Sequence, residues 1–218
     1  MHVIAVASSK GGVGKTTLSS ALAVRAARDS ERVAMVDLDP QGSLAGWWKR
    51  RGGSQDPCIF AGSDTASSAV EALALDGWDW VFLDTPPAFV ATIQDAITSA
   101  HLALIPLRAS ALDLIASEDA VIMARDAGIP HLCVINDAEP AWKTTSAARE
   151  YLRAASVPVA ETIVAHRAAY VAAVTSGKSG PEVEKPDRKG ELACSREIDA
   201  LWIEIKAALA SGKGAGRG

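Results

Sequence analysis

The chain has 218 residues, of which 49% are hydrophobic and 22% are charged, and its formal net charge is −4. This length suits one domain with a sizeable core, and this composition is that of ordinary soluble globular proteins. The slightly acidic balance excludes a uniformly basic nucleic-acid binder, so any contact with DNA needs a local basic patch. The cysteines lie far apart, at Cys58, Cys133 and Cys194, without a metal-ligand spacing or a disulfide pattern, which fits a reducing cytosol.

The N-terminal stretch predicts a buried strand, a glycine-rich turn and a helix in immediate succession. The apolar run over residues 3–7 leads into SSKGGVGKTT over Ser8–Thr17, and helical spacing continues to about Arg28. This context is typical of a phosphate-binding loop, because glycines let the backbone point N–H groups at a phosphate and the helix start adds positive charge. In such a loop Lys15 reaches the β and γ phosphates and Thr16 ligates Mg²⁺. The alternative is a glycine-rich turn without a ligand.

Two further predicted strands, over residues 32–37 and 79–84, each deliver an acid to a strand end. In an open α/β sheet, ligands bind at the edge formed by the carboxyl ends of the strands, so these acids are expected beside the first loop. Asp84 suits a Mg²⁺-holding carboxylate opposite the loop threonine. Asp37 and Asp39 suit work on a Mg²⁺-bound phosphate and its attacking water. The alternative for this second pair is an acidic turn that caps a helix.

The rest of the chain continues to alternate predicted helices and strands. Helices are predicted over 44–51, 63–75, 89–99, 110–128, 145–155 and 195–210, with strands over 58–60, 101–107 and 130–136, and a short strand or extended segment over 157–160. This alternation predicts an α/β fold with a doubly wound, mostly parallel sheet and helices on both faces. We expect one domain over residues 1–210, a loop over 176–190 and a flexible, mildly basic tail over 211–218.

The phosphate loop departs from the usual G-x-x-x-x-G-K-[ST] pattern, with Ser9 at the first glycine position and a second lysine, Lys10, inside the loop. In this it resembles the deviant Walker A motif of the ParA/MinD family of ATPases. The stretches over 36–43 and 84–87 resemble the switch I and switch II regions of that family. The resemblance covers almost the whole chain. It implies a P-loop NTPase fold and slow, Mg²⁺-dependent ATP hydrolysis in a nucleotide-sandwich homodimer that forms on ATP.

The resemblance also implies roles for individual residues. Lys15 holds phosphates, Lys10 crosses the dimer interface to the nucleotide of the partner subunit, and Asp39 positions the attacking water. Thr16 and Asp84 hold Mg²⁺, with Asp37 supporting the Mg²⁺ shell. The implied ATP contacts are Lys10, Gly11, Gly12, Val13, Gly14, Lys15, Thr16, Thr17, Asn136 and Pro158.

Without a helix-turn-helix before its first strand, the chain is similar to small ParA proteins that partition plasmids or chromosomes. This similarity implies non-specific DNA binding and work with a ParB-like adaptor at the nucleoid. Candidate DNA-backbone contacts are Arg149, Arg153 and Arg167, joined by His166, although a solvated helix surface explains each residue equally well. No signal peptide opens the chain and no apolar run approaches the ~18 residues of a membrane span, so we expect a cytoplasmic protein without a membrane partner.

Four alternative functions remain open from the sequence. ParA-like positioning of a protein cargo, such as chemoreceptor arrays or carboxysomes, differs only in the adaptor. A MinD-like division-site regulator needs a membrane-binding amphipathic helix, which the glycine-rich tail does not provide. A reductase of the nitrogenase iron-protein type needs paired cluster cysteines, and none lies near the switch II motif. A P-loop kinase or ligase is disfavoured by Lys10.

Overall fold

Buried parallel strands form the centre of the molecule. The computed structural model describes the chain except residues 30, 54–56, 61–64, 188–189, 191 and 216–218. Within this part, seven strands pair in the order β3-β2-β4-β1-β5-β6-β7, and every pair is parallel. The strands are β1 (His2–Val6), β2 (Val33–Asp37), β3 (Cys58–Phe60), β4 (Trp80–Asp84), β5 (Leu102–Leu107), β6 (His131–Ala138) and β7 (Val164–Ala165). Residues of β4 and β5 are buried throughout, because both faces of a parallel sheet are covered.

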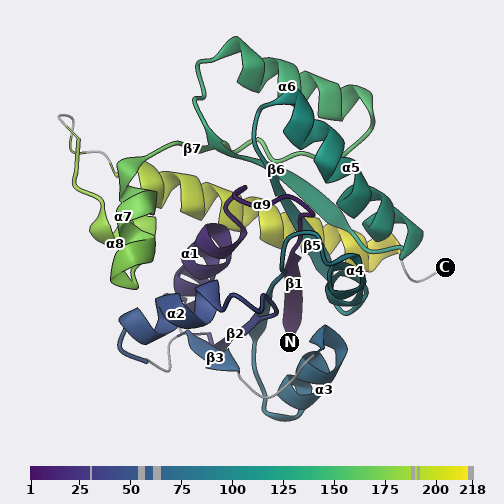
Figure 1. Cartoon of the computed structure of the whole chain (residues 1–218), viewed down its shortest axis with the longest axis vertical. Helices are drawn as coiled ribbons and strands as arrows, with labels where there is room; N and C mark the ends of the chain where they lie inside the picture. Colours follow the sequence, from purple (N-terminus) through teal and green to yellow (C-terminus); the bar gives the residue numbers. More distant parts are fainter. Residues whose placement is uncertain (30, 54–56, 61–64, 188–189, 191, 216–218) are drawn as a thin grey trace.

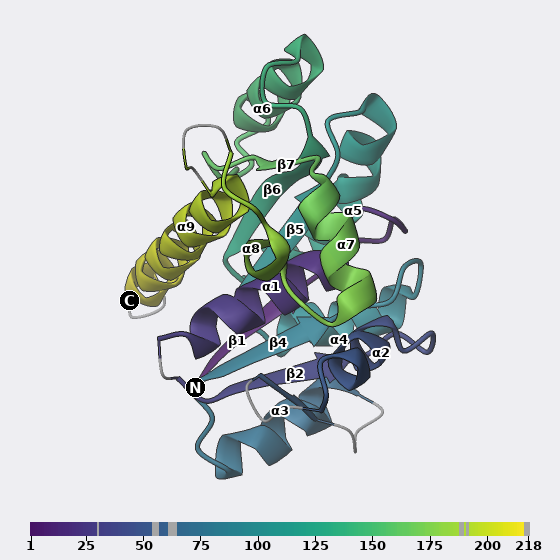
Figure 2. The same cartoon turned by 90° about the vertical axis from the view of Figure 1, so that its left-hand side faces the viewer.

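Helices cover both faces of this sheet (Figures 1 and 2). Alternate strand residues pack on opposite sides, and the core divides accordingly. One side holds α1 (Lys15–Ala27), α2 (Ser43–Arg50), α7 (Ala168–Ser176), α8 (Gly180–Val183) and α9 (Ala193–Ala215). The other side holds α3 (Ala66–Leu75), α4 (Val90–Thr98), α5 (Ala111–Asp126) and α6 (Lys143–Ala154). The predicted doubly wound α/β fold is therefore confirmed.

The sheet topology places the loop after β1 where the strand order reverses. Strand β1 pairs with β4 on one side and with β5 on the other, and the chain later adds β6 and β7 beyond β5. Figure 2 shows β1, β4 and β2 side by side and pointing the same way. Register places Asp37 beside Asp84 at the ends of neighbouring strands. Such a reversal point opens a crevice at the carboxyl edge of the sheet.

The C-terminal third differs from the prediction in two places. The expected loop over 176–190 contains α8, which begins with a capping box in which Ser179 and Glu182 bind each other's backbone. Its Gly and Pro residues predict a turn, but proline is equally suited to a first helical turn. Helix α9 continues to Ala215, into the segment expected to be a tail, because glycine in a helix costs only about 1 kcal/mol. The rest of that segment lies outside the described residues.

The other differences concern element ends. The predicted segment over 157–160 contributes one bridge, between Val159 and Cys133, and the last strand of the sheet is β7. The predicted helix over 63–75 is described from Ala66, since residues 61–64 lie outside the described part. Among the described helices, none is long and apolar enough to cross a bilayer.

Candidate functional site

The loop between β1 and α1 requires glycine at two positions. Gly12 and Gly14 have φ angles of +73° and +90°, a left-handed conformation that strains other residues. At Gly14 a side chain is also excluded by space, because a Cβ there would lie 2.2 Å from Nδ2 of Asn136. The loop thus approaches the end of β6 closely, and α1 begins directly after Gly14. No side chain caps the start of α1, and its first turn contains no acid. The positive end of this helix is therefore suited to bind an anion.

Lys15 folds back over this loop. Its Nζ donates to the carbonyl oxygens of Ser8 at 3.1 Å and of Lys10 at 2.9 Å, and the residue is only 7% exposed. Burial lowers the pKa of Lys15, and the nearby carboxylates of Asp84 and Asp39 partly offset that effect. Both acceptors of this ammonium group are neutral oxygens. A phosphate would give the same group an anionic partner, so the residues fit the expected nucleotide.

Asp84 lies buried beneath the start of α1. Thr16 Oγ1 donates to Asp84 Oδ2 at 2.7 Å, and Ser19 Oγ donates to Oδ1 at 3.2 Å. Burial raises the pKa of Asp84 to about 7, and the neighbouring Asp37 adds to that rise, while the two hydroxyl hydrogen bonds oppose it. Mg²⁺ prefers oxygen ligands and is usually held by one or two carboxylates together with phosphates. The Thr16–Asp84 pair supplies this donor set.

Asp37 and Asp39 shape the turn after β2. Asp37 Oδ2 accepts from the backbone N–H of Ala45 at 2.8 Å in the first turn of α2, and Oδ1 accepts from the backbone N–H of Asp39 at 3.1 Å in the turn before it. Burial raises the pKa of Asp37. Asp39 Oδ1 accepts from the backbone N–H of Gln41 at 2.9 Å, and its side chain is half-buried. Asp37 therefore has the capping role of the alternative interpretation, and its part in a Mg²⁺ shell stays a prediction.

Lys10 forms an ion pair within its own chain. Its Nζ lies 2.8 Å from Oδ1 of Asp113 in the first turn of α5. The Asp113 side chain is 6% exposed and that of Lys10 is 36% exposed. The resemblance implies instead that Lys10 reaches the nucleotide of a partner subunit. Sequence reasoning therefore missed this contact, which joins residues 103 positions apart.

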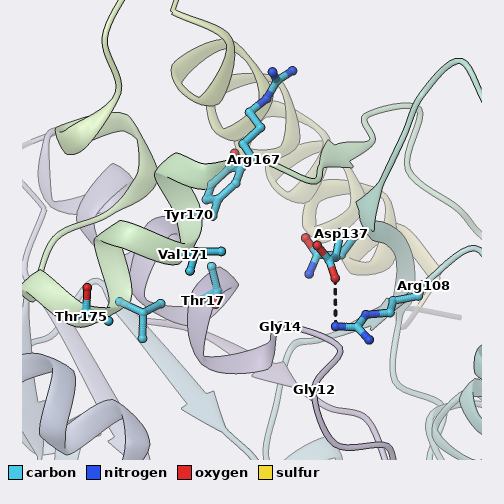
Figure 3. Close-up of a pocket in the computed structure, with 11 residues that line it drawn as sticks. Gly12, Gly14, Thr17, Arg108, Asp137, Arg167, Tyr170, Val171 and Thr175 are labelled. Carbon is cyan, nitrogen blue, oxygen red and sulfur yellow. Dashed lines mark ion pairs between the residues drawn. The ribbon is translucent and has the colours of Figure 1, made fainter.

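A cavity of about 340 Å³ adjoins the loop (Figure 3). Of the predicted ATP contacts, Gly12, Gly14, Thr17 and Asn136 line it. Asn136 is buried, and its Nδ2 donates to the carbonyl of Val13 at 2.7 Å, which ties the end of β6 to the loop. This volume suits a small-molecule ligand. The cavity is therefore the place where the first loop meets Asn136, the ATP contact predicted near the end of β6.

Pro158 is not among the residues that line this cavity. Its carbonyl accepts from the backbone N–H of Cys133, three residues before Asn136 on β6, which is about 10 Å along a strand. The prediction for Pro158 came from resemblance alone, and the segment that contains it pairs with the early part of β6. The wall opposite Asn136 is built from α7 instead.

Sequence reasoning missed most of that wall. The additional lining residues are Arg108, Asp137, Tyr170, Val171, Val174 and Thr175, and Arg167 lines the cavity although it was predicted only as a DNA contact. Arg108 directly follows β5, Asp137 is the second-last residue of β6, and the two pair at 2.9 Å, so their positions at strand ends were a usable signal. The α7 residues recur at helical spacing on one side of that helix, and nothing in the sequence alone says which side faces a ligand.

The arginines predicted to contact DNA are all paired with acids. Arg149 and Arg153 both contact Glu161, and Arg167 donates from Nε and Nη2 to Glu197 Oε1 at 2.9 and 2.6 Å. His166 contacts Asp137. The structure therefore places these residues near acids and does not gather them into an unpaired cationic face. Their contact with DNA stays a prediction.

Comparison with known proteins identifies the family of the chain. The model of the CbiA family, the CobQ/CobB/MinD/ParA nucleotide binding domain, matches residues 4–179. The chain is 33% identical over 211 residues to maintenance of carboxysome distribution protein A from Halothiobacillus neapolitanus, covering 93% of this chain and 95% of that protein. It is 36% identical over 156 residues to protein ParA from Rhizobium radiobacter, covering 66% of this chain and 68% of that protein.

Among solved structures, the septum site-determining protein MinD from Pyrococcus horikoshii, complexed with Mg-ADP, has a TM-score of 0.72 at 17% identity. That match covers 94% of this chain and 95% of the MinD chain, and at this identity it shows the fold alone. Together with the family match, it confirms the resemblance and the P-loop fold expected from the loop over 8–17. The chain belongs to the CobQ/CobB/MinD/ParA nucleotide binding domain family.

Proposed function

We propose that this chain is a Mg²⁺-dependent ATPase that dimerises on ATP and positions a protein cargo in the cytoplasm. The cluster of buried Lys15, buried Asp84 and half-buried Thr16 at the start of α1 is the observation that supports nucleotide hydrolysis. The cargo follows from the 33% identity to a carboxysome distribution protein over 95% of that protein. The family match and the Mg-ADP complex of MinD support ATP and Mg²⁺ as the cofactors.

In this proposal each residue of the site has a distinct task. Lys15 exchanges its carbonyl partners for phosphate oxygens, and Thr16 and Asp84 hold the cation. Asp39 orients the attacking water from the turn after β2, while the contacts of Asp37 keep that turn in place. Bound Mg²⁺ supplies charge stabilisation to the phosphates. Lys10 adds a positive charge from the second subunit, so we expect turnover to be slow in single chains.

Partition of DNA is the second candidate function. The 36% identity to protein ParA from Rhizobium radiobacter favours it, and a ParB-like adaptor would then link the ATPase to DNA. Both functions are compatible with non-specific binding to the nucleoid. Because the arginines expected at the DNA face are acid-paired, such binding would require those ion pairs to exchange or a face formed by two subunits together.

Nucleotide binding by Lys15→Ala tests the enzymatic part of the proposal. The substitution removes the ammonium group that meets the phosphates, so affinity for ATP should fall by at least about a hundredfold, as expected for loss of a buried charged contact. Titration calorimetry with Mg-ATP measures it, with Lys49→Ala on the exposed end of α2 as the control. Wild-type affinity in Lys15→Ala would count against the phosphate-loop interpretation.

An experiment in cells distinguishes a protein cargo from a DNA cargo. Deleting the gene should disperse or cluster a protein compartment if the cargo is protein, and should raise the loss rate of a resident plasmid if the cargo is DNA. Microscopy of the compartment and plasmid retention after growth without selection measure these outcomes. Co-sedimentation of the pure protein with DNA, and separately with liposomes, with and without ATP, distinguishes nucleoid binding from a MinD-like membrane role.

A further inference from the structure

Asp113 is a rigid acceptor at the start of α5. Ser110 is the N-cap of this helix, and its Oγ accepts from the backbone N–H of Asp113 at 3.2 Å. The same hydroxyl donates to Asp113 Oδ2. A carboxylate in the first turn of a helix is also favoured by the helix dipole. These contacts fix one carboxylate oxygen and leave Oδ1 directed to Lys10.

The phosphate loop is attached to α5 through two consecutive residues. Lys10 Nζ lies 2.8 Å from Asp113 Oδ1, and Ser9 Oγ donates to the carbonyl of Ala116 at 2.9 Å. Burial acts to raise the pKa of Asp113, but Lys10 and Ser110 hold that pKa below its usual value. Helix α5 therefore holds the side chain of Lys10 within its own subunit, whereas the proposed dimer requires this side chain at the nucleotide of the partner subunit.

The backbone of Lys10 is engaged as well. Its carbonyl accepts from Lys15 Nζ at 2.9 Å, so the two loop lysines are directly connected. If Lys15 turned to a phosphate, Lys10 would lose this backbone contact but keep its ion pair with Asp113 and its backbone N–H bond to Ser8 Oγ. The backbone of Lys10 thus contacts the group expected to meet the nucleotide, while its side chain is held by α5.

We infer that Asp113 is a positioning residue that retains Lys10 within its own subunit and so sets the ATP concentration at which two copies associate. This inference rests on the proposed ATP-dependent dimer. Lys10 must leave Asp113 to reach the nucleotide of a partner subunit, and its departure strands a carboxylate whose side chain is only 6% exposed. An unpaired acid at such a position opposes the exchange until the attraction between Lys10 and the phosphates of the partner's nucleotide outweighs that cost.

Asp113→Asn tests this role because it keeps the shape of the side chain and removes its charge. The ATP concentration for half-maximal dimer formation should fall by about threefold to fivefold, the range for an ion pair with one partly exposed partner. Light scattering after size-exclusion chromatography, over a series of concentrations of a non-hydrolysable ATP analogue, measures it. Asp119→Asn removes the same charge from an exposed position on α5 and should leave the threshold unchanged.

A double-mutant cycle with Lys10→Ala separates the ion pair from the helix cap. Asp113→Asn should have no further effect on dimer formation once Lys10 is absent, and thermal unfolding without nucleotide should show the same coupling. An equal threshold in wild type and Asp113→Asn, or an effect that persists in Lys10→Ala, would overturn the inference alone. A wild-type protein that binds ATP but never dimerises would overturn the proposed dimer and this inference with it.

Discussion

At the scale of single residues, burial shifts the pKa values of Lys15 and Asp84 in opposite directions. It lowers the pKa of the lysine and raises that of the acid to about 7, and the attraction between the two charges opposes both shifts. Burial therefore disfavours the charged form of both residues, because each charge loses contact with water. A phosphate beside Lys15 and a cation beside Asp84 would each reduce that cost, so we expect nucleotide and metal to favour each other's binding.

The raised pKa of Asp84 predicts a pH-dependent stability. An acid of pKa about 7 in the folded chain and 3.8 in the unfolded chain binds more protons when folded between these values. Stability therefore falls as pH rises from about 4 to 7, by at most about 1.4 kcal/mol per pH unit from this group, and changes little above pH 7. Asp84→Asn should remove this slope, so that its melting temperature relative to wild type rises between pH 5.5 and 7.5 in Mg²⁺-free buffer.

Asp79→Asn provides the control for that comparison, because Asp79 is an acid that also lies next to β4 but is exposed. Its melting temperature should track that of the wild type, apart from a constant offset for its hydrogen bond to the backbone of Arg32. Parallel pH profiles for wild type and Asp84→Asn would show that Asp84 is ionised in the folded chain throughout this range.

At the scale of elements, α9 and α2 hold α7 against the cavity. Glu197 of α9 accepts from Arg167 through Oε1 and from the Tyr170 hydroxyl through Oε2 at 3.1 Å. From the other side, Arg50 at the end of α2 donates to the carbonyl of Val174, and Arg51 pairs with Glu182 at 2.9 Å. Helix α2 directly follows the turn that contains Asp39. The same helix therefore connects that turn to the cavity wall formed by α7.

Glu197→Gln should weaken nucleotide binding through this wall. The amide keeps an acceptor for one neighbour but loses the charge that holds Arg167, whose side chain is 35% exposed, so the expected loss is about threefold. The affinity for a fluorescent ADP measures it, and Glu71→Gln on the opposite face, in α3, is the matched control. Unchanged affinity, or a fall in hydrolysis rate with no change in affinity, would show that Glu197 does not support nucleotide binding through the α7 wall.

The carboxyl edge of the sheet is predictable from sequence, whereas the α7 wall is not. Lys15, Thr16 and Asp84 belong to strand-end motifs, and parallel strands bring such ends together whatever the loops do. Tyr170 and Glu197 meet only because α7 and α9 pack on the same face, a long-range contact that local patterns do not encode. The same reason explains the arginines: their position on helices suggested a basic face, but Glu161 neutralises two of them from a separate loop.

At the scale of the whole molecule, the residues proposed for catalysis and those proposed for assembly lie at one surface. The phosphate loop, the turn with Asp39 and the start of α5 lie together at the carboxyl edge of the sheet, and Lys10 belongs to this edge. A second copy placed there would meet both the water-positioning acid and the lysine. Hydrolysis, by removing the γ-phosphate, would then also end the association, so that blocking hydrolysis should leave the assembly intact.

Asp39→Ala should therefore accumulate the ATP-bound dimer. The substitution removes the carboxylate proposed to orient water and leaves Lys15, Thr16 and Asp84 in place, so turnover should fall by on the order of a hundredfold while ATP affinity is retained. Phosphate release measures turnover, and light scattering after size-exclusion chromatography in Mg-ATP measures the dimer. Asp126→Ala, at the exposed end of α5, should behave as wild type in both assays. Normal turnover in Asp39→Ala would exclude that acid from the reaction, and slow turnover without a persistent dimer would separate hydrolysis from assembly.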